Sequence, residues 1–189
     1  MNIVYGGVFN PPTIAHENAI KKVLSLLNVE QFIVVPVGGS YHLKNVTDDL
    51  HRFSMTQIMC NKLGVDISDI ELKSDMYEGT YSLLKKLDLP NCKFMMGSDN
   101  LNVIHKWIDP EKILDEYGLV VLARDANVDS IIMQNALLKK YKKNIIVIED
   151  FDYNVSSTMF RESLDFSLVS KEIKKYIIES DLYGGNHVS

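Results

Sequence analysis

Short apolar runs alternate with amphipathic stretches along the whole chain, and this alternation limits the fold more than any other feature. The apolar runs have strand length, and in the stretches between them apolar residues recur at the spacing of one helix face. The expected strands span residues 2–7, 31–37, 66–72, 92–97, 118–124 and 144–150. The expected helices span residues 17–27, 48–63, 79–89, 109–117, 130–141, 156–164 and 170–183.

Most of the expected strands are continuously apolar, as parallel strands are when both faces of a sheet are covered. Strand and helix also take turns along the chain, which is typical of α/β proteins. We therefore expect a doubly wound parallel sheet with helices on both faces, forming a single domain of residues 1–189. Ligands of such sheets bind beyond the carboxyl ends of the strands, so we look for function in the loops that follow each strand.

Composition disfavours several classes of partner. The formal net charge is -5 and no basic tail offsets it, which disfavours binding to nucleic acid. The start of the chain has no signal-peptide pattern, and no apolar run approaches the roughly 20 residues that span a bilayer. Cys60 and Cys92 lack metal-ligand spacing and are expected as buried thiols in a reducing compartment. We expect a cytoplasmic protein that binds neither nucleic acid nor membrane, and the sequence leaves a homo-oligomer open.

The loop after the first expected strand reads GGVFNPPTIAH, residues 6–16. Two glycines at a strand end allow backbone N–H groups to come close to a phosphate. Thr13 can cap the helix that follows, and His16 then lies in the first helical turn, where it can face an anion. The two prolines replace the pattern GxGxxG, so an NAD-binding dehydrogenase is a weak alternative.

Later loops carry further candidate residues. After the strand at 92–97, Asp99 can hold a ribose hydroxyl or a metal-bound phosphate, or it can cap a helix. Trp107, the only tryptophan, can stack on a flat heterocycle, or it can lie in the core. Near the end of the chain, the stretch NVSSTMFRES places hydroxyls at a helix start and Arg161 one turn later, a combination that can bind phosphate.

Taken together, these loops resemble the nucleotidyltransferase superfamily that carries the motifs (H/T)xxH and SxTxxR. The first motif corresponds to residues 13–16, TIAH, and the second to residues 156–161, SSTMFR. Along nearly the whole chain, stretches such as MGSDNLNVIHKW and IKKYIIESDLYG are similar to bacterial nicotinate-nucleotide adenylyltransferases. The resemblance implies a Rossmann-like fold and transfer of AMP from ATP to nicotinate mononucleotide, which gives deamido-NAD and pyrophosphate. It also implies Mg²⁺, which we expect to ride mainly on the ATP phosphates because the sequence has no dedicated carboxylate cluster.

The resemblance also implies roles for individual residues. The implied ATP-binding residues are Gly7, Val8, Phe9, Thr13, His16, Gly97, Asp99, Ser157, Thr158 and Arg161. The implied acceptor-binding residues are Asn10, Thr80, Trp107 and Arg124. The implied catalytic residues, all of which would contact phosphate, are His16, Lys44 and Arg161. No metal ligand is expected from the protein itself.

The chain departs from the usual pattern of this family in its phosphate-binding loops. Thr13 stands where the family usually has His, Ala15 where it usually has Gly, and residues 41–44 read YHLK instead of Pro-His-Lys. The departures leave open nicotinamide mononucleotide or phosphopantetheine as acceptor, and a nucleotide sensor that does not turn over. Trp107 and the stretch GTYSLL favour a pyridine nucleotide.

Overall fold

A six-stranded parallel sheet forms the centre of the protein. The structure is a computed structural model that describes residues 1–38, 46–123, 127–151 and 153–187. The strands are β1 (Asn2–Gly7), β2 (Gln31–Pro36), β3 (Asp66–Ile67), β4 (Cys92–Gly97), β5 (Leu119–Leu122) and β6 (Ile145–Ile148). Their order is β3-β2-β1-β4-β5-β6, and every neighbouring pair is parallel. This is the doubly wound strand order, so the predicted single-domain α/β fold is confirmed.

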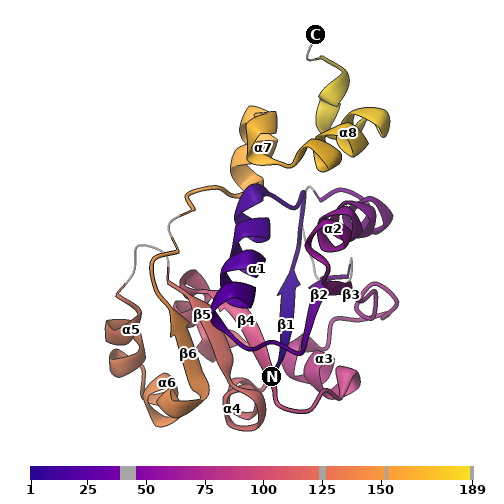
Figure 1. Cartoon of the computed structure of the whole chain (residues 1–189). Coiled ribbons are helices and arrows are strands. Elements are labelled where there is room, and N and C mark those ends of the chain that lie inside the picture. The colour runs from indigo at the N-terminus through magenta and orange to yellow at the C-terminus, as the bar shows by residue number, and fades with distance from the viewer. Residues whose placement is uncertain (39–45, 124–126, 152, 188–189) are drawn as a thin grey trace.

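Helices cover both faces of this sheet (Figure 1). The α-helices are α1 (Ile14–Leu26), α2 (Asp49–Leu63), α3 (Gly79–Leu87), α4 (Pro110–Lys112), α5 (Val128–Gln134), α6 (Ala136–Lys140), α7 (Ser157–Ser163) and α8 (Lys171–Glu179). Shorter 3₁₀ segments span Ser98–Lys106 (η1), Lys142–Asn144 (η3), Phe166–Leu168 (η4) and Leu182–His187 (η5), and a π-helical turn spans Ile113–Tyr117 (η2). None of the helices in the described ranges is long and apolar enough to cross a membrane.

The sheet separates two hydrophobic cores, because successive side chains of a strand point to opposite faces. In β1, Ile3 packs into the core under α1, α2 and α8, whereas Val4 packs into the core under α3, α5 and α6. Each core also holds one free cysteine, Cys60 in the first and Cys92 in the second. Burial raises the pKa of these thiols to about 12 and about 11, so both stay protonated and unreactive.

The order of the strands decides where a ligand can bind. β1 and β4 are neighbours at the centre, but the chain continues from β1 to one side of the sheet and from β4 to the other. The loops that leave these two strands therefore diverge and open a crevice at the carboxyl edge of the sheet. The last helices, α7 and α8, lie beyond this same edge, past the tip of the β1 arrow in Figure 1. The end of the chain is thus brought to the loop that follows β1.

The third expected strand is mostly wrong. Residues 66–72 alternate apolar and polar side chains, yet only Asp66–Ile67 pairs with the sheet. Ser68 then ends the ladder, because its hydroxyl oxygen accepts the N–H of Ile70 at 3.3 Å and starts a local turn. The turn continues with the N–H of Ser74 donating to the carbonyl of Glu71 at 3.3 Å. As a result, Glu71 lies beyond the carboxyl edge of the sheet rather than within a strand.

The helix expected over 130–141 is two helices. Asn135 takes an extended backbone between α5 and α6, and its side-chain oxygen accepts the N–H groups of Leu137 and Leu138 at 3.0 and 3.1 Å. Such an N-cap stabilises the start of a new helix, so Asn135 itself favours the break between α5 and α6. The stretch expected as one helix over 109–117 is likewise divided, into α4 and the π-helical turn η2.

Candidate active site

A cavity of about 490 Å³ opens where the loops after β1 and β4 diverge. It is lined by the carboxyl ends of β1 and β4, by Val8 after β1, by η1, and by the segment that leads into α3. The predicted site residues among its lining are Gly7, Val8, His16, Thr80, Gly97, Asp99 and Trp107. The structure therefore brings together predicted ATP-binding and acceptor-binding residues around one space.

His16 is held at the start of α1 by a reciprocal cap. Thr13 is the N-cap residue, and its N–H donates to Nδ1 of His16 at 2.9 Å. The hydroxyl oxygen of Thr13 lies at the same distance from Nδ1. Because Nδ1 accepts the backbone N–H, the ring carries its proton on Nε2, and the imidazole presents an N–H donor on its other side. Thr13 caps α1 as predicted, and its position places a neutral donor at the helix start.

Aromatic side chains fix the ring of His16 further. The ring centroid of Phe9 lies 5.2 Å away at an interplanar angle of 65°, and that of Tyr5 lies 6.3 Å away. Phe9 itself is buried and has a positive φ of 49°, a conformation that is uncommon for a bulky residue. The turn therefore folds the Phe9 ring back under Gly7, where a Cβ atom would come within 2.9 Å of it. This close approach explains the glycine and leaves the backbone of the turn facing the cavity.

Arg52 of α2 fixes the residues that follow β1, and sequence reasoning gave this arginine no role. Its side chain is fully buried, and its guanidinium donates to the carbonyl of Val8 at 2.7 Å and of Val37 at 2.5 Å. It also pairs with Asp49 at 2.5 Å. These bonds tie the residues after β1 to those after β2. An arginine on the apolar face of an expected helix is the signal that indicates such a buried role.

The two sequence motifs meet on the loop between β1 and α1. The hydroxyl of Ser157 donates to the carbonyl of Pro11 at 2.7 Å, and Nη1 of Arg161 donates to the carbonyl of Asn10 at 2.7 Å. Nη2 of Arg161 donates to the hydroxyl of Thr158 at 3.2 Å. The start of α7 is thereby locked onto the loop that leads to His16. Ser157, Thr158 and Arg161 are not part of the cavity lining.

Asn10 is buried between this loop and the end of the chain. Its side-chain oxygen accepts the phenol O–H of Tyr183 at 2.5 Å and the N–H of Thr47 at 3.4 Å. Burial raises the pKa of Tyr183 to about 12, so the phenol remains a donor. The structure therefore places Asn10, a predicted acceptor contact, inside the loop scaffold rather than on the cavity wall. Tyr183 is a second residue to which sequence reasoning assigned no role.

The opposite side of the cavity carries the predicted acceptor contacts. Thr80 is buried at the start of α3, and the indole of Trp107 meets the ring of Phe94 edge-on at a centroid distance of 5.8 Å. Gly97 makes room for the carboxylate of Asp99, whose Oδ1 would lie only 2.4 Å from a Cβ atom at that position. Asp99 lies in the first turn of η1 rather than at its N-cap, so the capping alternative is wrong.

Other predicted site residues and several lining residues complete the comparison with the sequence. Lys44 and Arg124 lie outside the described residues, and Phe9 lies under the turn rather than on the cavity wall. Sequence reasoning missed six polar or aromatic residues of the lining, which are Tyr5, Glu71, Tyr77, Phe94, Asn100 and Lys106. Lys106 directly precedes the predicted site residue Trp107, so the sequence could have indicated its position near the site. Glu71 was missed because residues 66–72 were expected to form a strand.

The charged groups of the cavity are mixed in sign. Lys106 and the Nε2–H of His16 offer donors to an anion, whereas Asp99 and Glu71 offer carboxyl groups. Burial raises the pKa of Glu71 to about 7, although Lys86 opposes the shift. Within the described ranges, no three His, Cys, Asp or Glu side chains are grouped closely enough to hold a metal ion. The donors of Lys106 and His16 suit an anionic ligand.

Comparison with known proteins agrees with this geometry. Residues 4–163 match the sequence pattern of the family described as cytidylyltransferase-like. The chain is 32% identical to the probable nicotinate-nucleotide adenylyltransferase of Acholeplasma laidlawii, with 97% of each chain covered. It superposes on the nicotinic acid mononucleotide adenylyltransferase of Plasmodium falciparum complexed with APC, with a TM-score of 0.78 and 26% identity over 98% of both chains. The same Plasmodium enzyme complexed with NaAD gives a TM-score of 0.77 and 27% identity over 98% of both chains. The chain thus belongs to the cytidylyltransferase-like nucleotidyltransferases and, among them, to the nicotinate-nucleotide adenylyltransferase family.

Proposed function

We propose that the protein transfers AMP from ATP to nicotinate mononucleotide, giving deamido-NAD and pyrophosphate. The observation that carries the proposal is the pairing of the two motif loops beside one cavity. Ser157 and Arg161 bond to the loop that positions His16, and the cavity beyond holds Thr80 and Trp107. Relatives named for this reaction match nearly the whole chain, and a neighbouring structure holds NaAD. A nucleotidyltransferase needs this combination of a phosphate end and an acceptor end.

The reaction needs no base from the protein. A phosphate monoester has a second pKa of about 6, so the acceptor phosphate is already largely dianionic at neutral pH. One of its oxygens attacks the α-phosphorus of ATP in line, a new phosphoanhydride bond forms, and the bond to the β-phosphate oxygen breaks to release pyrophosphate. Alignment of the two reactants can contribute up to about 7–11 kcal/mol. The chemical task of the chain is therefore to hold two anions together in one orientation.

Several groups of this chain can perform that task. The Nε2–H of His16 and the backbone N–H groups at the start of α1 can bind the ATP phosphates. Arg161 keeps further guanidinium N–H groups beyond the two bonds that anchor it, so it can bind phosphate without leaving the loop. Lys106 adds positive charge on the acceptor side. Donors that favour the spread charge of the transition state lower the barrier more than they tighten ground-state binding.

Mg²⁺ fits this site as a companion of ATP. The cavity lining includes the carboxylate of Asp99, and Mg²⁺ is commonly held by one or two carboxylates together with substrate phosphates. We propose that the phosphate oxygens supply most of its ligands and that Asp99 contributes at most one. When bound, the ion neutralises charge on the phosphates of ATP. The buried free thiols support placing the protein in a reducing cytoplasm.

The acceptor is tested by offering nicotinate mononucleotide, nicotinamide mononucleotide and phosphopantetheine in turn with ATP and Mg²⁺. Pyrophosphate release is the measurement. The proposal expects release with nicotinate mononucleotide at the highest kcat/KM. Preference for phosphopantetheine contradicts the acceptor assignment, and no release with any acceptor supports the sensor without turnover.

A further inference from the structure

We propose that Glu71 sets the choice between an anionic and a neutral acceptor ring: its neutral carboxyl donates a hydrogen bond to an anionic ring substituent, and its ionised carboxylate repels that substituent. The inference rests on the proposed function and deepens it. It assigns a specificity-determining residue to a position that the sequence had placed in a strand.

Glu71 belongs to the wall between two adjoining cavities. A small cavity of about 20 Å³, the room of one water molecule, adjoins the cavity of about 490 Å³. Glu71, Tyr77 and Leu83 line both. Leu83 lies one helical turn after Thr80, which lines the large cavity as well. Glu71 and the predicted acceptor contact Thr80 therefore line the same large cavity.

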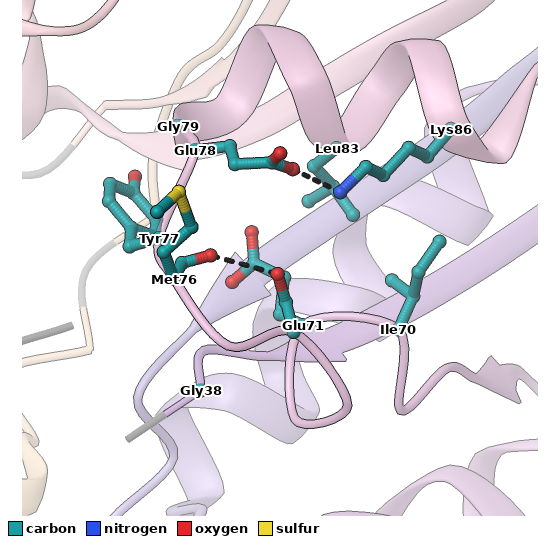
Figure 2. A pocket seen from close by; sticks show the side chains of 10 residues that line it. Gly38, Ile70, Glu71, Met76, Tyr77, Glu78, Gly79, Leu83 and Lys86 are labelled. Carbon is teal, nitrogen blue, oxygen red and sulfur yellow. Dashed lines mark hydrogen bonds and ion pairs between the residues drawn. The ribbon is translucent and has the colours of Figure 1, made fainter. Parts of the chain in front are cut away.

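The nearby cation is engaged elsewhere. Lys86 of α3 forms an ion pair with Glu78, the N-cap residue of the same helix. In Figure 2, Nζ of Lys86 is turned to Glu78, while the side chain of Glu71 points into the small cavity. Among the described residues, the Glu71 carboxyl has no hydrogen bond and no ion pair to another side chain. It is therefore available to a ligand.

The backbone around Glu71 leaves it little freedom to withdraw. The Cα atom of Gly38 approaches the carbonyl of Glu71 so closely that a Cβ atom there would lie 2.3 Å from it. Two bonds within the turn, from the N–H of Ser74 to Glu71 and from the hydroxyl of Ser74 to the carbonyl of Met76, hold the segment that carries the carboxyl. A group held in this way must be compatible with whatever ring occupies the cavity.

The charge of Glu71 decides whether the cavity favours a nicotinate or a nicotinamide ring. Nicotinate carries a carboxylate, and two ionised carboxylates at close range repel each other strongly in a partly buried site. A protonated Glu71 removes the repulsion and supplies a donor. Nicotinamide carries an amide whose N–H groups can instead donate to the ionised form. The two acceptors therefore call for opposite protonation states of one residue.

The surroundings make this switch accessible near neutral pH. Burial raises the pKa of Glu71 to about 7, and Lys86 is the positive group that opposes the shift. The other charged or titratable groups around it are Glu78 and Tyr77 beside the small cavity, and Asp99, Lys106 and His16 on the large one. Below the pKa of Glu71 its carboxyl group is neutral and can bind the nicotinate ring as a hydrogen-bond donor. Above it the carboxylate rejects nicotinate, so affinity for that acceptor falls as the pH rises.

The test is the ratio of kcat/KM for nicotinate mononucleotide to that for nicotinamide mononucleotide, measured with ATP and Mg²⁺ from about pH 6 to about pH 9. The phosphate of the acceptor and the groups that bind ATP affect both acceptors alike, so their titration cancels in the ratio. We expect the ratio to fall above about pH 7, approaching tenfold per pH unit for a single required proton.

Three variants sharpen the test. Glu71→Gln cannot ionise, so its ratio stays constant with pH. Lys86→Met removes the charge that lowers the pKa of Glu71, so the fall moves to higher pH. Glu116→Gln makes the same change at an exposed carboxylate that bonds to Tyr81 outside the cavity, and it keeps the wild-type profile.

The outcomes separate this inference from the proposed function. A wild-type ratio that is constant across the range overturns the role of Glu71, and so does a fall that persists in Glu71→Gln. Failure to turn over either acceptor at any pH contradicts the proposed function instead. If Glu71→Gln does not fold, the wild-type profile and the shift in Lys86→Met still decide the question.

Discussion

At the scale of single residues, the protonation of His16 follows from its cap. The backbone N–H of Thr13 donates to Nδ1, so the ring acts as a neutral Nε2–H donor. Sequence reasoning placed His16 in the first turn of a helix, where it can face an anion. The structure keeps the position and favours a hydrogen-bond donor over a fixed charge, because a second proton on Nδ1 would break the cap.

His16→Ala is expected to lower kcat by about 10²–10³, the cost of removing one donor that stabilises transition-state charge. The KM for ATP should change little, since the backbone N–H groups of α1 and the anchored Arg161 remain. Steady-state kinetics with a circular-dichroism check on folding measure this. Near-normal turnover in a folded variant contradicts the assignment of His16.

At the scale of elements, the site is assembled by polar groups that fasten loops to helices. Arg52 ties α2 to the residues after β1 and β2, and Ser157 and Arg161 tie α7 to the loop before α1. Motif spacing indicated that the two motifs cooperate. It could not show that part of their hydrogen bonding serves the loop itself, because that depends on which carbonyls the fold brings near.

Arg52→Met is expected to lower the free energy of unfolding by about 3–5 kcal/mol, because Asp49 and the partly buried carbonyls of Val8 and Val37 each lose the bond to the buried guanidinium. Urea denaturation measures the change. Lys85→Met, at an exposed position on α3, is the matched control and should stay within about 0.5 kcal/mol of the wild type. Equal stability of the two variants would show that the buried guanidinium is not needed to hold the loops.

Tyr183→Phe removes the phenol that donates to Asn10 and leaves the ring packing on Phe160 in place. We expect a loss of about 1 kcal/mol in the ordering of the loop and a rise of about fivefold in the KM for ATP. Tyr153→Phe, at an exposed tyrosine, serves as the control. Unchanged kinetics in Tyr183→Phe would mean that the end of the chain does not support the site.

At the scale of the whole molecule, the alternating pattern predicted the architecture well, because parallel strands buried on both faces leave a strong apolar signal in the sequence. It failed at β3, an edge strand of two paired residues, where a serine turn imitates strand alternation. It also failed at Asn135, where one cap divides a helix. Local hydrogen bonds of short polar side chains decided both places, and periodicity does not register them.

The candidate site was predictable to the same extent. Residues next to strand ends, such as Gly7, His16 and Asp99, were found because the fold class says where to look. Glu71 and Tyr183 were missed because their places depend on how the turn after β3 and the end of the chain pack against distant loops. The proposed pH-dependent choice of acceptor comes from one of these missed residues.

The central claim is that this chain joins the α-phosphate of ATP to nicotinate mononucleotide, and labelled ATP tests it most directly. With the label on the α-phosphorus, the account predicts that the label appears in deamido-NAD, in an amount equal to the pyrophosphate released. With the label on the γ-phosphorus, it predicts that the label appears only in pyrophosphate. Label that stays in ATP, or that becomes attached to the protein, contradicts the account.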